Sequence, residues 1–211
     1  MRRIPLLCSV LLVSGCSALG ALDEASRPLA AYDLQAAGAG PVARGGASAG
    51  ELVVESPVVG GALDTDRILI RPDPLEARYL PGARWTDPTA AMVQTLMVRR
   101  LDATGGFRHV GRRPLGSAGD YALLSELTDL QAEAFDDAGT VTAHIRLDAK
   151  LLREDDARIL AGRVFEASVP AGSTEAADVV SALDRAMSMI LDDLSRWLMQ
   201  RLDVPVAAAP G

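Results

Sequence analysis

Residues 140–152, with the sequence TVTAHIRLDAKLL, decide the fold class. Apolar and polar side chains alternate along this run: Val141, Ile145, Leu147 and Leu151 on one side, and Thr142, His144, Arg146, Asp148 and Lys150 on the other. Strict alternation predicts a β-strand with one buried face and one wetted face. The turn residues Asp137-Ala138-Gly139 and Asp155-Asp156 predict hairpins to strands on either side, from Tyr121 and over residues 158–168. The run is therefore expected to be the middle strand of an antiparallel meander.

A long amphipathic helix is predicted towards the C-terminus, over residues 173–201. Ser173 and Thr174 supply its N-cap and Glu175 its first turn. Apolar side chains recur at alternating spacings of three and four: Val180, Leu183, Met187, Ile190, Leu194 and Trp197. This seam predicts packing on a sheet or a partner. Charged residues on the other faces exclude a membrane span: Asp178, Asp184, Arg185, Asp192, Asp193 and Arg196.

Shorter elements are predicted towards the N-terminus. Strands are expected at Tyr32-Asp33-Leu34 and over residues 51–56, 67–71 and 107–110. Pro81-Gly82 predicts a turn, and Thr86-Asp87-Pro88 predicts the N-cap and first turn of a helix over residues 88–103 that Gly105 and Gly106 end. We expect an α+β fold, a mostly antiparallel sheet with two helices packed on one face.

The chain is predicted to hold one domain, residues 32–201. The Gly/Ala-rich residues 36–50 are expected to form a flexible loop, and residues 202–211, frayed from Val204 onwards, a disordered tail.

The first fifteen residues resemble an export signal, with Arg2 and Arg3 before an apolar run over residues 4–13 that is too short to span a bilayer. Val13-Ser14-Gly15-Cys16 then resembles the lipobox of bacterial lipoproteins. We expect residues 1–15 to be removed, Cys16 to carry a diacylglycerol and an N-acyl chain, and residues 16–31 to form the tether. Ser17 favours the outer membrane over the inner membrane, on the periplasmic side of the envelope.

The alternative is a disulfide between Cys16 and Cys8 behind an ordinary signal peptide. Cys8 lies within the segment expected to be discarded, which disfavours that pairing. The formal charge, −7 for the whole chain, moves to about −9 when Arg2 and Arg3 are removed. A chain this acidic disfavours nucleic acid as a partner.

Three sequence patterns resemble catalytic or metal-binding sites but are better explained by structural roles. Gly46-Ala47-Ser48-Ala49-Gly50 matches a nucleophile elbow but lies in the Gly/Ala stretch. His109 and His144 are isolated, so no metal ligand set is expected, and His144 is predicted to face solvent. Three acidic doublets could be imagined as calcium ligands: Asp136-Asp137, Asp155-Asp156 and Asp192-Asp193. The first two are predicted to lie in hairpin turns, where turn chemistry explains them better.

The basic run Arg108, His109, Arg112 and Arg113 is a candidate contact for a lipid head group or an acidic partner, because guanidinium groups bind phosphate in bidentate fashion. A solvated loop is the competing interpretation of the same residues. No cofactor is expected apart from the lipid on Cys16, and no catalytic residue.

The order of motifs resembles the ABC-type transport auxiliary lipoprotein family, which includes the paraquat-inducible lipoprotein PqiC. The resemblance rests on short segments spread over the chain: Cys16, Tyr32-Asp33-Leu34, residues 61–68, residues 79–85, Gly106-Phe107 with Val110, residues 120–123 and the strand around residues 163–165. The Gly/Ala insertion after Leu34 and Gln131-Ala132-Glu133 depart from the pattern, which leaves the partner surface open.

The resemblance implies a non-enzymatic accessory of an MCE-type system. Its partners would be an MCE-domain protein and an ABC permease and ATPase, and its role would be to support phospholipid traffic between the inner and outer membranes. The alternative is a lipid- or ligand-binding lipoprotein that works alone. The sequence leaves the oligomeric state and the transported lipid open.

Overall fold

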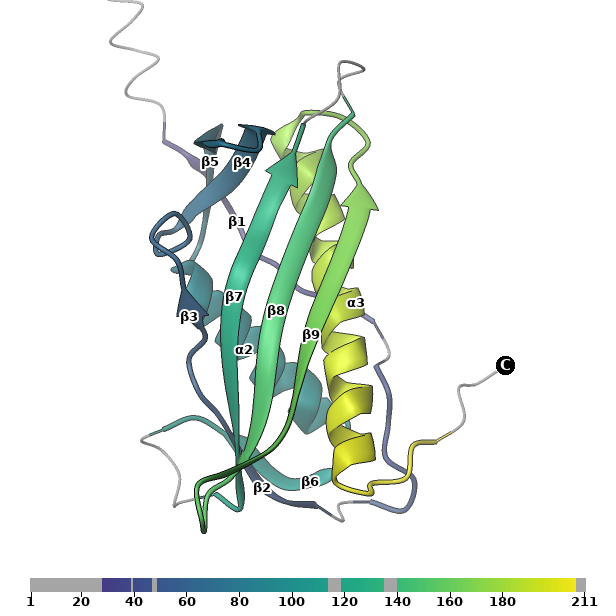
Figure 1. Ribbon diagram of the computed structural model, residues 1–211. Coiled ribbons are helices and arrows are strands. Elements are labelled where there is room, and N and C mark those ends of the chain that lie inside the picture. Colours follow the sequence, from purple (N-terminus) through teal and green to yellow (C-terminus); the bar gives the residue numbers. More distant parts are fainter. Residues whose placement is uncertain (1–27, 39, 47–48, 114–118, 135–139, 208–211) are drawn as a thin grey trace, which may run out of the picture.

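The computed structural model describes residues 28–38, 40–46, 49–113, 119–134 and 140–207. Cys16, the signal, the doublet Asp136-Asp137 and the turn at Asp137-Ala138-Gly139 lie outside these residues. The described chain forms a nine-stranded mixed sheet with two helices behind it (Figure 1). The predicted α+β class, with a mostly antiparallel sheet and two helices, is confirmed.

The meander of β7 (Tyr121–Glu133), β8 (Thr142–Arg153) and β9 (Arg158–Pro170) forms the long-stranded half of the sheet, with β7 inside the sheet and β9 at its edge. Both pairings are antiparallel and run nearly the full length of the strands. Ile145, Leu147 and Leu151 are at most 1% exposed, whereas Lys150 is exposed. The alternation predicted for residues 140–152 is therefore confirmed.

The second edge of β7 is shared by three short strands in succession. Its first residues pair with β2 (Ala49–Val54), its middle with β3 (Val58–Val59) and its last residues with β4 (Arg67–Asp73), all parallel to it. The pairing of β2 and β4 with β7 was not predicted, and neither was β3.

The sheet continues outwards from β2 and β4. The strand β6 (Phe107–Gly111) pairs in parallel with β2, and β5 (Glu76–Trp85) pairs antiparallel with β4. Beyond β5 lies β1 (Ala30–Tyr32), in parallel register. The sequence prediction of a Pro81-Gly82 turn is wrong, because both residues lie inside β5. They form an irregularity in its pairing with β4, where Gly82 adopts a φ of 69°.

The helices α2 (Thr89–Ala103) and α3 (Ala176–Arg201) supply most of the layer behind the sheet. The seam predicted for α3 is buried, and Trp197 meets Phe165 of β9 edge to face at 5.7 Å between ring centroids. The predicted N-caps are wrong. Neither helix has a side-chain cap; instead, the Thr89 backbone and hydroxyl both donate to the Thr65 carbonyl, at 3.1 and 2.9 Å.

The ends predicted to be flexible are packed where the structure describes them. Val204 is 3% exposed, and Val206 forms an antiparallel bridge with Ala43. Residues 202–207 thus lie against the domain, contrary to the prediction of a disordered tail from Val204. At the other end, Ala30 and Ala31 belong to the sheet, so the tether expected to reach residue 31 ends earlier.

Candidate functional site

The segment after β1 is fixed to the helices. We call residues 34–44 the strap; Ala39 within it is not described. The carboxylate of Asp184 on α3 accepts hydrogen bonds from the backbone N–H groups of Gln35 and Ala36, both at 2.7 Å. Four residues further along the helix, Ser188 donates to the Ala37 carbonyl at 3.3 Å. The Gly/Ala stretch predicted to be a flexible loop is therefore pinned over its first half.

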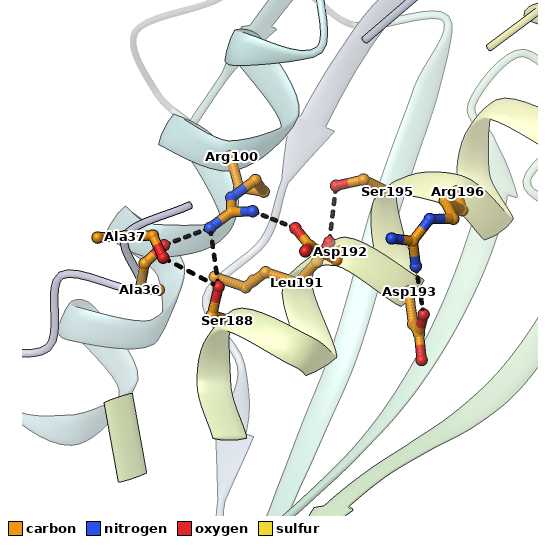
Figure 2. Close-up of polar contacts among 9 residues, drawn as sticks. All are labelled: Ala36, Ala37, Arg100, Ser188, Leu191, Asp192, Asp193, Ser195 and Arg196. Atoms are coloured by element: carbon orange, nitrogen blue, oxygen red, sulfur yellow. Dashed lines mark hydrogen bonds and ion pairs between the residues drawn. The ribbon is translucent and has the colours of Figure 1, made fainter. Parts of the chain in front are cut away.

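Arg100 of α2 is the central residue of this contact (Figure 2). Its guanidinium is 7% exposed and bonds both the Asp192 carboxylate and the Ala36 carbonyl. One buried cation thus ties α2, α3 and the strap together. Because a buried charge is costly unless it is paired and hydrogen-bonded, the two acceptors explain why Arg100 can be placed here.

Asp184, Ser188 and Asp192 are spaced by four residues, so they form one row along α3. The sequence placed Asp184 and Asp192 away from the apolar seam, which is correct. It did not show that the strap covers them. The only sequence signal was this regular spacing of short polar side chains on a second face of the helix.

A shallow groove of about 330 Å³ opens between the strap and the helices. Apolar side chains line much of it, including Val42, Leu96 and Leu191, and Arg99 and Arg100 line one part. Arg100 is held by its partners, whereas Arg99 is exposed and makes no hydrogen bond or ion pair with the described residues. The groove could hold an amphiphile with a small anionic head.

The basic run does not converge on one point. Arg113 is paired with Glu55, at 2.6 Å, and with Glu154, and the hydrogen bond that it donates to Glu55 is the main cause of its raised pKa. Arg112 donates to the Thr95 hydroxyl of α2 at 2.6 Å. Arg108 and His109 are exposed on β6. Two of the three arginines thus serve contacts within the domain, and a head-group role for the run stays a prediction.

The two described acidic doublets have arginine partners. Asp155 and Asp156 form ion pairs with Arg153 at 2.9 and 2.7 Å. The hydrogen bond that Arg153 donates to Asp156 holds the pKa of Asp156 well below its usual range. Asp192 pairs with Arg100, and Asp193 pairs with Arg196 at 2.7 Å. Within the described ranges, no cluster of three His, Cys, Asp or Glu residues suits a metal ion.

The remaining motifs lie apart from one another. His144 bonds the Ser168 hydroxyl at 3.0 Å on the outer face of the sheet and is half-buried there. Ala49 and Gly50, the last residues of the elbow-like pentapeptide, enter β2 rather than a helix. Ala47 and Ser48 lie outside the described residues. A nucleophile elbow needs a helix after the serine, and a strand stands there instead.

The face of the β7–β8–β9 meander that points away from the helices is open (Figure 1). Arg146 of β8 stands in register between Asp129 of β7 and Glu166 of β9, and it forms an ion pair with Glu166. Lys150 and Val164 lie exposed on the same face. This is a broad, mixed-charge surface suited to contact with a protein.

The family model of the ABC-type transport auxiliary lipoprotein component matches residues 32–195, from the end of β1 to within α3. The chain belongs to this family. The family is not a known enzyme family, and its members are lipoproteins associated with the cell envelope. Its description associates them with an ABC transport system. Among curated proteins, none matches the sequence.

Two solved structures share the fold of this auxiliary lipoprotein. A crystal structure of a protein from Xanthomonas campestris is 27% identical, with a TM-score of 0.74, and the match covers 82% of this chain and 95% of that one. A second crystal structure, of an uncharacterized protein, is 16% identical with a TM-score of 0.64 and covers 82% and 99% of the two chains. Nearly the whole of each of those two chains therefore has a counterpart in this one.

No described helix of the auxiliary lipoprotein is both long enough and apolar enough to cross a bilayer. The longest helix, α3, buries one face on the sheet and part of a second under the strap and α2. Only a narrow stripe that includes Met189 is left exposed on it. The outer face of the meander is therefore more open than the surface of α3.

Proposed function

We propose that this auxiliary lipoprotein is anchored through Cys16 to the outer membrane and supports an MCE-type ABC system that moves phospholipid across the periplasm. The family membership over residues 32–195 is the observation that carries the proposal. The lipobox-like Val13-Ser14-Gly15-Cys16 and the following Ser17 support the anchor and its membrane. The proposed partners are an MCE-domain protein and the ABC permease and ATPase.

The open face of the meander is the proposed partner surface. It offers side chains of both signs and the exposed Val164, with no described element packed over it. Interfaces of accessory proteins use such mixed surfaces, in which charge arrangement sets specificity. The helices and the strap then act as the rigid support behind that face.

Co-purification tests this role. The tagged protein extracted from envelopes should enrich the MCE-domain protein or an ABC component. In Cys16→Ser, the anchor is removed while the domain is untouched, so we expect a folded protein in the periplasmic fraction. Wild-type protein that enriches no transport component would contradict the proposal, and Cys16→Ser that stays in the membrane would contradict the anchor.

A charge exchange tests the partner surface. In the double variant Arg146→Glu with Glu166→Arg, the exposed pair is kept within the domain but its pattern towards a partner is inverted. The carboxylate introduced at position 146 faces Asp129, so we expect the melting temperature to fall by at most about 4 °C. Recovery of the partner should fall about tenfold or more, since like charges placed opposite each other cost affinity. The exchange of Arg196 and Asp193, an exposed pair on α3, is the matched control and should leave recovery unchanged.

The groove beside Arg99 favours one second candidate, a lipid-binding lipoprotein that works alone. Its apolar lining and unpaired guanidinium suit a single acyl chain with an anionic head. Native mass spectrometry of the protein extracted from membranes would detect such a ligand as added mass that Arg99→Ala reduces. A spectrum that holds the protein alone would remove this candidate.

A further inference from the structure

The tip of the β4–β5 hairpin carries the most exposed large apolar side chain of the described residues. Leu75 is 96% exposed, and the neighbouring residues 73–78 are exposed as well. The tip has no part in the pinning of the strap or in the open face of the meander. A single exposed leucine is common on protein surfaces, so the position of Leu75 relative to the membrane anchor decides what it can do.

Few backbone N–H groups of the tip are left to be hydrogen-bonded by water. Pro72 and Pro74 lack an N–H group, and the N–H of Leu75 donates to the Asp73 carboxylate at 2.9 Å. The side chain of Glu76 is paired with Arg78 at 2.6 Å. Since unsatisfied backbone donors are the main obstacle to placing a loop in a bilayer, this tip is suited to shallow contact with lipid.

The direction of β1 places the tip on the side from which the tether arrives. In the parallel register Ala30 lies beside Ala83 and Tyr32 beside Trp85. Followed backwards from Tyr32 to Ala30, β1 therefore points along β5 from Trp85 towards Glu76, which is at the hairpin tip. In Figure 1 the purple start of the described chain and the β4–β5 hairpin lie at the same end of the molecule.

The length of the tether is compatible with a position of the hairpin tip at the membrane surface. From Ala83 back to Glu76, β5 spans at most about 23 Å, and Pro28 lies about two residues nearer the tip. The twelve or so residues between Cys16 and Pro28 have an expected end-to-end distance of about 20 Å if flexible, and at most about 40 Å if extended. The anchor and Leu75 can thus reach the same bilayer surface together.

We infer that the β4–β5 hairpin is a second membrane contact, in which Leu75 enters the head-group region of the bilayer that holds the Cys16 lipid. The inference rests on the anchor of the proposed function. A single leucine suffices, because the anchor already confines the domain to the surface. Full burial of one leucine then shifts the equilibrium between orientations roughly ten- to hundredfold. The open sheet face is held in a fixed orientation to the periplasm as a result.

A single-cysteine probe tests the contact. With Cys8 removed with the signal and the sulfur of Cys16 bonded to lipid, Leu75→Cys gives the mature chain one free thiol. That thiol is labelled with an environment-sensitive fluorophore in full lipoprotein reconstituted into phosphatidylethanolamine and phosphatidylglycerol vesicles. Val58→Cys, on β3 and 65% exposed in the wild type, is the matched control.

At position 75 we expect emission at shorter wavelength and quenching by nitroxides on the lipid chains several times stronger than at position 58. A vesicle-bound protein whose label at 75 stays as water-exposed as that at 58 would overturn the hairpin contact and leave the anchor intact. A label that becomes protected only when a transport partner is added would overturn it too and assign the tip to that protein. A chain that does not remain with the vesicles would overturn the anchor, and the hairpin contact with it.

Discussion

At the scale of single residues, Arg100 is the side chain on which most of the strap contact depends. Its two closest acceptors lie on different segments, the Asp192 carboxylate on α3 and the Ala36 carbonyl in the strap. Arg100→Ala should lower the free energy of unfolding by about 2–4 kcal/mol, since it leaves both acceptors without their donor; the lower part of this range is expected because Asp192 is 24% exposed.

Urea denaturation measures this loss, with Arg99→Ala as the control. Arg99 is the neighbouring arginine of the same helix, exposed and unpaired among the described residues, so its removal should change the free energy of unfolding by no more than about 0.5 kcal/mol. Equal effects of the two substitutions would show that the Arg100 cluster does not hold the strap.

The turn between β8 and β9 predicts a pH effect. Arg153 holds the pKa of Asp156 below its usual value of about 3.9. Because the carboxylate is favoured in the folded state, its contribution to stability is present above that usual value and is lost as the pH falls through the lowered pKa. Arg153→Gln should move the pKa of Asp156 back up in an NMR titration of the carboxyl carbon. Arg196→Gln should leave it unchanged, and an Asp156 that titrates normally in the wild type would refute the pairing.

At the scale of elements, the strands with a strict pattern were predictable from the sequence, and those shaped by distant contacts were not. The alternation in residues 140–152 and the seam of α3 each bury one face, so the local pattern determines the element. By contrast, β3 is two residues long and exists because it lies beside the middle of β7. The strap was predicted to be flexible because its composition is Gly and Ala, yet its backbone is held by Asp184, which is about 150 residues away in sequence.

In β5, too, the local sequence pattern predicted the wrong structure, at Pro81-Gly82. Pro81-Gly82 is typical of a turn, but the left-handed φ of Gly82 here serves an irregularity within a strand. Gly82→Ala should cost about 1–2 kcal/mol of folding free energy, because a Cβ at φ 69° is strained even though the space around it is open.

The control for this position is Gly60→Ala, which also meets open space but has no left-handed φ and should be neutral within about 0.5 kcal/mol. Thermal unfolding of the two variants separates backbone strain from any loss of packing. A Gly82→Ala variant as stable as the wild type would show that β5 does not need this backbone conformation.

At the scale of the whole molecule, three surfaces divide the work of the proposed lipoprotein. In the proposed account the helical layer under the strap is internal support, the outer face of the meander binds a partner, and the end that carries β1 and the β4–β5 hairpin faces the membrane. The lipidation of Cys16 could be proposed from sequence because the lipobox-like pattern is a local motif. A membrane contact at Leu75 could not be proposed from sequence, because the position of the β4–β5 hairpin relative to the anchor depends on the parallel pairing of β1 with β5.

Transport itself is the most direct test of this account. In a strain of the source bacterium that lacks this gene, the rate at which labelled phospholipid moves between the inner and outer membranes would be compared after complementation with wild-type protein and with Cys16→Ser. We predict that the wild type restores the rate and that Cys16→Ser, although folded and present in the periplasm, does not. Full restoration by Cys16→Ser, or no change in the rate when the gene is deleted, would contradict the claim that this chain is a membrane-anchored accessory of lipid transport.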